Sequence, residues 1–259
     1  MIAKSYGSKL RYFKADVSLP LYGARNLALE KIRGKYITFL DCDDMWLSNK
    51  LELQVKALEE NKNVGLIHTN VEILELNGNK RIKHKVIQPI CKVFRELLKN
   101  YHINLQSVMI PRIVLNNLDY WFDESMLYSG DADLFLRIAY DWDILYMPQI
   151  LAQYREHGTS LSATRIEKIV AENEKALINL SKRSNDFMNN YKLEISRFRF
   201  RAQLSVVVAK WKYISGVEAR KAIGKKLSSS WLLGLLYILS FLPYKIVNDI
   251  KTRFFDKVY

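Results

Sequence analysis

The chain has 259 residues, of which 49% are hydrophobic and 12% aromatic, a composition that predicts a folded protein with a large core and excludes a disordered one. Its two cysteines, Cys42 and Cys91, provide neither a disulfide framework nor zinc-type spacing, which favours a reducing compartment. The net charge of +13 lies mostly in residues 161–259, which carry 19 Lys and Arg against 8 Asp and Glu.

Neither end of the chain has a typical membrane or export signal. Met1–Leu10 is polar, so we expect no secretory signal peptide and a cytoplasmic protein. The longest apolar run, from Trp231 to Leu242, is shorter than the roughly 20 residues that span a bilayer, and Pro243 ends it. Together with the basic residues nearby, this run predicts a segment that lies on an anionic membrane; a helix packed on the rest of the protein is the alternative.

The first predicted elements lead to a cluster of acids. Ile2–Gly7 is interpreted as the end of a helix, and Lys9–Lys14 as a short strand. Helical spacing of apolar residues predicts a helix over Gly23–Arg33. A strand over Tyr36–Phe39 follows, and its uncharged, β-branched and aromatic residues favour a central strand that is covered on both faces.

Three carboxylates, those of Asp41, Asp43 and Asp44, come directly after this strand. In an open α/β sheet the ligand crevice lies at the carboxyl ends of the strands. Close carboxylates repel one another unless a cation or hydrogen-bond donors neutralise them, and all-oxygen ligands suit Mg²⁺ or Mn²⁺. Capping of the next helix by Asp43 or Asp44 is an equally good interpretation of the spacing alone.

The middle of the chain alternates between helical and extended patterns, with a two-residue hairpin signal at Asn77-Gly78. This alternation predicts an α/β fold. The predicted elements are a helix capped by Ser48 and ending near Asn61, extended segments over Val64–Leu76 and Arg81–Ile87, a helix over Val93–Asn100, a strand over Asn104–Ile110, a helix over Arg112–Leu118, a helix that begins near Gly130, and strands over Ile144–Met147 and Ile150–Tyr154.

A second acidic locus lies in the first turn of the helix near Gly130. For Asp133 we favour a role in the helix N-terminus, whereas Asp131 lies one step earlier and could project into a cleft. His157 follows the last predicted strand, and a single histidine of this kind is more often structural than catalytic. His68, His84 and His102 receive no functional interpretation.

Several short motifs recur in a fixed order over roughly residues 1–160, which makes them more specific together than a single D-x-D. They are Ala24-Arg25-Asn26, Gly34-Lys35-Tyr36, Phe39-Leu40-Asp41-Cys42-Asp43-Asp44 with Trp46, Gly130-Asp131-Ala132-Asp133-Leu134-Phe135-Leu136-Arg137, and Tyr154-Arg155-Glu156-His157.

This ordered set resembles the family-two inverting glycosyltransferases of the GT-A fold. The resemblance implies that Asp41 and Asp43 form the D-x-D that holds the ribose and diphosphate of a nucleotide-sugar through Mg²⁺ or Mn²⁺, with Asp43 and Asp41 as metal ligands. It implies that Arg25 lies near the nucleotide and that His157 belongs to a loop over the diphosphate. Asp131 matches the aspartate that acts as base on the acceptor hydroxyl.

Two departures from the family pattern stand out. Gly130 occupies the position where members usually have a glutamate. The first strand of the family and its Asp-Gly-Ser segment are not found, so we expect residues 1–160 to be a GT-A-like domain that lacks its first βα unit. Residues 161–259 are expected to form a basic helical region with an apolar segment over residues 229–255.

The resemblance implies a glycosyltransferase that moves a sugar with inversion from a nucleotide-sugar, expected to be a UDP-sugar, to a glycan or lipid-linked acceptor. A pathway of surface polysaccharide or lipopolysaccharide type, at the inner face of the cell membrane, fits this activity. A non-catalytic remnant that serves as a partner or scaffold is the alternative. Nucleic acid is not an expected partner, because no nucleic-acid-binding motif accompanies the basic charge.

Overall fold

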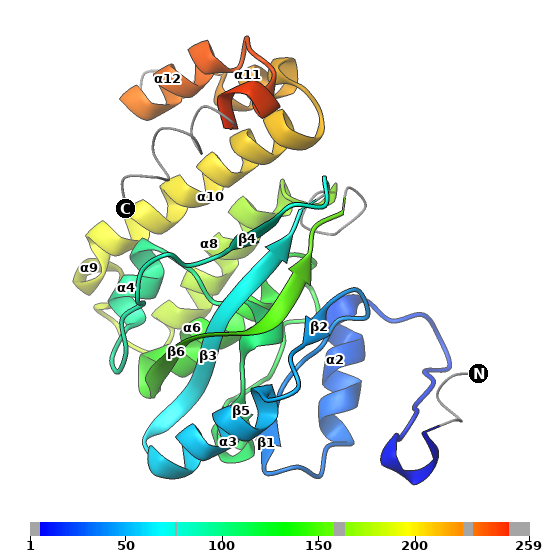
Figure 1. The fold of residues 1–259 in the computed structure, drawn as a ribbon. Helices are drawn as coiled ribbons and strands as arrows, with labels where there is room; N and C mark the ends of the chain where they lie inside the picture. The colour runs from blue at the N-terminus through cyan, green and yellow to red at the C-terminus, as the bar shows by residue number, and fades with distance from the viewer. Residues whose placement is uncertain (1–5, 76, 158–163, 225–229, 249–259) are drawn as a thin grey trace.

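The computed structural model describes residues 6–75, 77–157, 164–224 and 230–248, which form a mixed α/β body with a helical extension (Figure 1). The helices are η1 (Gly7–Lys9), α2 (Leu21–Glu30), α3 (Lys50–Glu60), α4 (Phe94–Lys99), η2 (Leu105–Ser107), α5 (Arg112–Asn116), α6 (Gly130–Asp141), α8 (Lys168–Ser181), α9 (Phe187–Asn190), α10 (Lys192–Tyr213), α11 (Gly216–Ile223) and α12 (Trp231–Leu239).

Two long parallel strands, β3 and β6, form the centre of a four-stranded sheet with the order β2-β6-β3-β4. Both outer pairs are antiparallel, and β1 and β5 form a separate two-stranded antiparallel sheet. The predicted α/β class is therefore confirmed. The strands are β1 (Tyr36–Ile37), β2 (Met45–Trp46), β3 (Val64–Leu74), β4 (Lys80–Ile82), β5 (Ile110–Pro111) and β6 (Asp143–Arg155).

The strand before the acidic cluster is shorter than predicted and does not lie at the centre of the main sheet. Only Tyr36 and Ile37 pair with another strand, and their partner is β5. The ladder ends at Thr38 because its side-chain hydroxyl, rather than its main chain, bonds the Val108 carbonyl at 2.6 Å. The residues between Thr38 and β2 therefore form a loop, and this loop contains Asp41, Asp43 and Asp44.

Other predictions were confirmed or corrected by the packing. The hairpin at Asn77-Gly78 joins β3 to β4 as predicted, with Gly78 at a positive φ of 83°. The strand over Lys9–Lys14 is wrong, because these residues are mostly exposed and pair with no described strand. The strand over Asn104–Ile110 is also wrong for most of its length, since a 3₁₀ turn, η2, occupies its middle.

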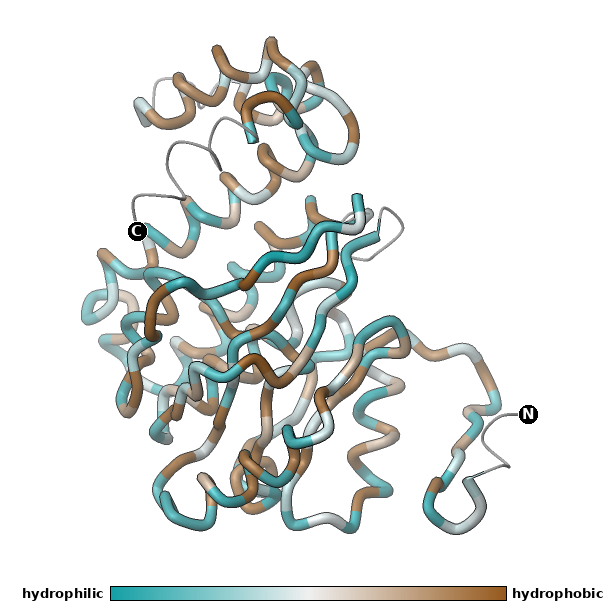
Figure 2. The backbone as a smooth tube through the Cα atoms, viewed as in Figure 1, coloured by the Kyte–Doolittle hydropathy of each residue, from teal (hydrophilic) through white to brown (hydrophobic). Residues whose placement is uncertain are grey.

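The largest buried cluster joins the sheet to the helices that follow it in the chain. Leu66 and Ile144 from the sheet and Leu134 from α6 share this cluster with Leu177 of α8 and Phe198 of α10. Residues on either side of position 160 thus bury one common core, and α8 and α10 are fixed against the body that carries the acids. Figure 2 shows hydrophobic stretches along the strands of the sheet and along the helices.

A smaller cluster holds α11 and α12 against the C-terminal part of α10, at the end of the molecule that is distant from β1 (Figure 1). Leu233 of α12 is buried there, while Trp231, Ile238 and Phe241 are 80%, 68% and 66% exposed. None of the helices in the described parts of the chain is long and apolar enough to cross a bilayer. Residues 229 and 249–255 of the predicted apolar segment lie outside the described residues.

Candidate functional site

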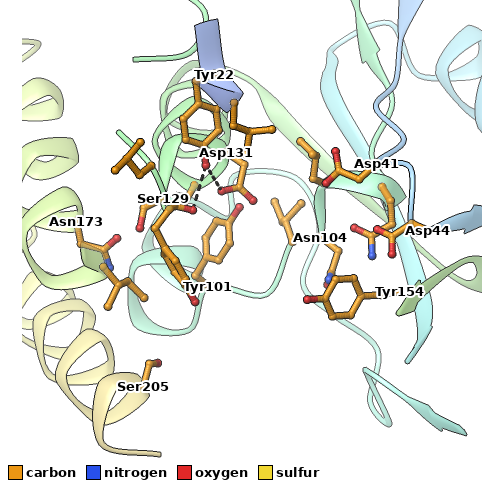
Figure 3. Close-up of a pocket in the computed structure, with 18 of the residues that line it drawn as sticks. Tyr22, Asp41, Asp44, Tyr101, Asn104, Ser129, Asp131, Tyr154, Asn173 and Ser205 are labelled. Atoms are coloured by element: carbon orange, nitrogen blue, oxygen red, sulfur yellow. Dashed lines mark hydrogen bonds between the residues drawn. The ribbon is translucent and has the colours of Figure 1, made fainter. Parts of the chain in front are cut away.

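A cavity of about 710 Å³ lies between the acidic loop after β1, the start of α6 and the helices α8 and α10. The five residues to which the family resemblance assigned a role line it: Arg25, Asp41, Asp43, Asp131 and His157. Figure 3 shows Asp41 and Asp44 on one side and Asp131 beside Tyr22 near the centre. Residues that are more than a hundred positions apart in the sequence therefore meet in one site.

Each acid of the cluster has a different partner on the cavity wall. Asp41 accepts a hydrogen bond from Arg25 Nη2 at 2.7 Å, and Asp43 Oδ2 lies 2.7 Å from His157 Nε2.

Asp44 Oδ1 accepts the backbone N–H of Arg155 at 3.0 Å, which joins the loop to the end of β6. The next helix, α3, begins only at Lys50, and no side chain caps it. The capping interpretation of Asp43, Asp44 and Ser48 is thus wrong.

The environment of Asp44 shows how much negative charge the loop concentrates. Burial, with the charges of Asp43 and Asp41 as further causes, raises the pKa of Asp44 to about 6, although the Arg155 backbone bond opposes the shift. A raised carboxyl pKa means that burial and the neighbouring carboxylates disfavour the anion, whereas a nearby cation would favour it. The acidic side of the cavity therefore attracts positive charge.

Arg25 is positioned by the short motif in which it occurs. The side chain of Asn26 bonds both the carbonyl and the N–H of Phe122, at 2.9 and 3.1 Å, and so fixes α2 against the loop before α6. The guanidinium of Arg25 then lies over the rings of Tyr22 and Phe122, at 5.5 and 5.7 Å from their centroids. The rings of Tyr22 and Phe122 thus contact the guanidinium of Arg25, and the carboxylate of Asp41 is its ion-pair partner.

Asp131 lies in the first turn of α6 and faces the cavity. Burial raises the pKa of its carboxyl, and the nearby charge of Arg25 opposes that effect. A raised carboxyl pKa in a cleft is a frequent property of groups that exchange protons.

Asp133 differs from Asp131, because it is fully buried and pairs with Arg137 at 2.9 Å. Asp133 lies in the first turn of α6 as predicted, but the predicted capping is wrong, because no side chain caps this helix and Asp133 is bound by Arg137 instead.

The loop before Asp131 is held by two side chains that the sequence did not single out. The carboxylate of Glu172, from α8, accepts the backbone N–H groups of Leu127, Tyr128 and Ser129 at 2.8, 2.8 and 2.7 Å. The hydroxyl of Tyr22 accepts the N–H of the next residue, Gly130, at 2.8 Å. Four consecutive N–H groups are therefore bound by two side chains from distant elements.

The same contacts explain why a glycine stands before Asp131. A Cβ atom at Gly130 would lie 2.6 Å from the ring of Tyr22, closer than any normal contact. The hydroxyl of Tyr22 lies 3.5 Å from Asp131 Oδ1 and donates to the Tyr128 carbonyl at 3.0 Å. Tyr22 thus fills the space that a larger side chain at position 130 would need, and contacts Asp131 itself.

The acidic loop suits a divalent cation in its chemistry. Within the described parts of the chain, no group of three or more His, Cys, Asp or Glu side chains is arranged to hold a metal ion. Mg²⁺, however, is commonly held by one or two carboxylates together with substrate phosphates. Asp41 and Asp43 offer such carboxylate oxygens at the wall of a cavity with room for a phosphate-bearing ligand.

Comparison with known proteins agrees with the motifs. The model of glycosyl transferase family 2 matches residues 1–113. The chain is 30% identical over 164 residues to UDP-Glc:alpha-D-GlcNAc-diphosphoundecaprenol beta-1,3-glucosyltransferase WfgD of Escherichia coli, and 32% identical over 175 residues to an uncharacterized glycosyltransferase of Methanocaldococcus jannaschii. These alignments cover 62% and 64% of the chain, and the chain spans 62% and 59% of the two relatives.

The structure of S. aureus TarS 1-349 superposes with a TM-score of 0.55 at 12% identity, covering 88% of this chain and 68% of that chain. At this identity the likeness concerns the fold alone, and it confirms the predicted GT-A architecture. Residues 1–113 are thus similar to glycosyl transferase family 2, and the motif around Asp41 lies within that match.

Proposed function

We propose that this protein transfers a sugar with inversion from a nucleotide-sugar, a UDP-sugar, to a glycan or lipid-linked acceptor in surface polysaccharide synthesis. The single observation that carries the proposal is the cavity of about 710 Å³, which gathers Arg25, Asp41, Asp43, Asp131 and His157. The relative from Escherichia coli, by its name, uses UDP-glucose and a sugar linked through a diphosphate to a lipid. That name supports the choice of donor and acceptor class.

In this proposal the acidic side of the cavity holds the donor. Asp41 and Asp43 would hold Mg²⁺ or Mn²⁺, which supplies positive charge to stabilise the departing nucleoside diphosphate. Arg25, which is 11% exposed, keeps Asp41 in place and faces the nucleotide. His157 pairs with Asp43 at 2.7 Å, so the segment after β6 is coupled directly to the donor site.

Asp131 is proposed as the base that removes the proton of the acceptor hydroxyl. The hydroxyl oxygen then forms a bond to the anomeric carbon as the bond to the diphosphate breaks on the opposite face, and this in-line displacement inverts the configuration. The raised pKa of Asp131 suits the role, because a base is most effective when its pKa approaches the working pH.

The experiment that tests this role is Asp131→Asn, assayed for sugar transfer from UDP-glucose to N-acetylglucosamine joined through a diphosphate to an alkyl chain. We expect transfer to fall by roughly 10²–10⁴-fold while binding of UDP stays unchanged. The control is Asp141→Asn at the other end of α6, where the side chain is 42% exposed and pairs with Arg183. Transfer by Asp131→Asn equal to that of Asp141→Asn and the parent would rule out Asp131 as the base, whereas no transfer by the parent itself would favour a non-catalytic scaffold.

We propose in addition that α12 brings the protein to the membrane that carries such an acceptor. Its apolar side chains Trp231 and Ile238 are strongly exposed, and Lys245 adds positive charge nearby. An apolar face next to basic residues suits the surface of an anionic bilayer.

The test is flotation with anionic vesicles of the double variant Trp231→Ser/Ile238→Ser, which should lose vesicle binding. Ile113→Ser, which removes a 59% exposed apolar side chain from α5, should keep it. Equal flotation of both variants would contradict the proposed contact.

A further inference from the structure

The cavity has a second wall, formed by α8 and α10, that the proposed donor site does not use. Phe198, Arg201, Ala202 and Ser205 of α10 line it at helical spacing, so one face of the helix points into the cavity. Asn173 of α8 completes this wall. In Figure 3, Asn173 and Ser205 lie on the side opposite Asp41 and Asp44, with Asp131 between the two sides.

Several polar side chains at this wall and at the adjoining floor of the cavity have no hydrogen-bond partner within the part of the protein that the structure describes. Asn173 is only 7% exposed, and its side chain makes no hydrogen bond to another described residue. The hydroxyl of Tyr101 and Nε2 of Gln106, which also line the cavity, are buried without a partner in the described structure. Buried polar groups are nearly always hydrogen-bonded, so such a set at one cavity indicates a polar ligand.

Arg201 gives this wall a positive charge. Its side chain is exposed and lines the cavity, and no carboxylate among the described residues pairs with it. Arg199, two positions earlier on the same helix, is in contrast bound by Glu174. A guanidinium that is not neutralised within the described structure suits a phosphate group, which it can bind through two parallel hydrogen bonds.

We propose that the α8–α10 wall is the acceptor subsite and that it takes a sugar carrying a phosphate-type anion. Asn173 and Tyr101 bind sugar hydroxyls, and Arg201 binds the anion. The inference rests on the proposed function: because displacement is in line, the acceptor must approach Asp131 from the side opposite the donor. The acidic wall is the donor side, and the α8–α10 wall faces it across Asp131.

The test measures binding by calorimetry, in the presence of EDTA, of N-acetylglucosamine joined through a diphosphate to a short alkyl chain. Arg201→Gln should weaken binding of this probe by roughly 10–100-fold, the value of one charge-assisted hydrogen bond. Arg201→Lys should restore part of the affinity. The matched control is Arg197→Gln, which removes an exposed arginine from the same helix away from the cavity.

Two further arms distinguish the parts of the ligand. The alkyl glycoside of N-acetylglucosamine, which has no diphosphate, should bind more weakly and be insensitive to Arg201→Gln. Asn173→Ala should weaken both probes. Because Asn173 is buried, the urea midpoint of this variant is measured beside its affinity, and Arg201→Gln, at an exposed site, keeps the test valid if Asn173→Ala fails to fold.

The outcomes separate this inference from the proposed function. Equal affinities of the probe for Arg201→Gln and Arg197→Gln would overturn the subsite, as would a loss confined to UDP binding in Mn²⁺, because Arg201 would then belong to the donor side. Binding of the probe with the expected pattern, in a protein that fails to bind UDP, would uphold the subsite and contradict the proposed donor.

Discussion

Glu172→Gln tests how the loop that carries Asp131 is held in place. The carboxylate of Glu172 accepts three backbone N–H groups, those of residues 127, 128 and 129, at 2.8, 2.8 and 2.7 Å. Glutamine has nearly the same shape, but only one of its two terminal atoms accepts hydrogen bonds. Leu127 bonds one carboxylate oxygen while Tyr128 and Ser129 bond the other, so at least one N–H must lose its acceptor.

The expected loss of stability follows from these bonds. A buried donor without an acceptor costs about 1–3 kcal/mol, and the bonds that remain lose their charge-assisted part. We therefore expect Glu172→Gln to lower the free energy of unfolding by about 2–4 kcal/mol, measured as a lower midpoint of urea unfolding at an unchanged slope. Amide exchange of residues 127–130 should accelerate in the same variant.

The control is Glu174→Gln on the same helix. Glu174 is 41% exposed and pairs with Arg199, and exposed pairs of this kind contribute at most about 1 kcal/mol. Equal urea midpoints for the two variants, with unchanged exchange at residues 127–130, would refute the argument that Glu172 holds the loop.

The remaining predictions concern Gly130 and the partly buried His84. Gly130→Ala should destabilise the protein by about 1–3 kcal/mol, because its Cβ would meet the ring of Tyr22 at 2.6 Å, and an unchanged melting temperature would contradict this. Burial lowers the pKa of His84 to about 4, so the unfolded chain takes up a proton near pH 6.5 while the folded protein does not. Stability should therefore decline as the pH falls from about 6.5 to about 4, because protonation of His84 then favours the unfolded chain. His84→Asn should reduce that slope in urea midpoints; an identical pH profile would exclude His84 as a source.

Elements with a local pattern could be predicted from the sequence. The turn at Asn77-Gly78 needs a positive φ that glycine adopts at little cost, and it was predicted correctly. Asn104–Ile110 was mistaken for a strand because its apolar residues Leu105 and Val108 are buried by tertiary contacts, with no regular period behind them. One-dimensional patterns cannot distinguish such a buried turn from a buried strand.

The site was predictable only in part, because the sequence reveals local patterns but not the contacts between distant elements. Asp41 and Asp43 directly follow the predicted strand, so a position near the end of a strand could be inferred, although the strand itself ends earlier, at Ile37. The choice between capping and a cleft depended on where α3 begins, which the sequence did not reveal. Glu172, Tyr22 and Arg201 had no local signal, because their roles depend on contacts with elements far away in the chain. A glycine at position 130 was the one sign in the sequence that something else fills the space beside Asp131.

The most direct test of the central claim is a calorimetric titration of UDP into the protein, with Mn²⁺ and with EDTA. The account predicts binding that requires Mn²⁺, is lost in Asp43→Asn and is kept in Asp141→Asn, because only Asp43 belongs to the acidic wall of the cavity. Absence of binding, or binding of equal strength by Asp43→Asn and the parent without regard to Mn²⁺, would contradict it.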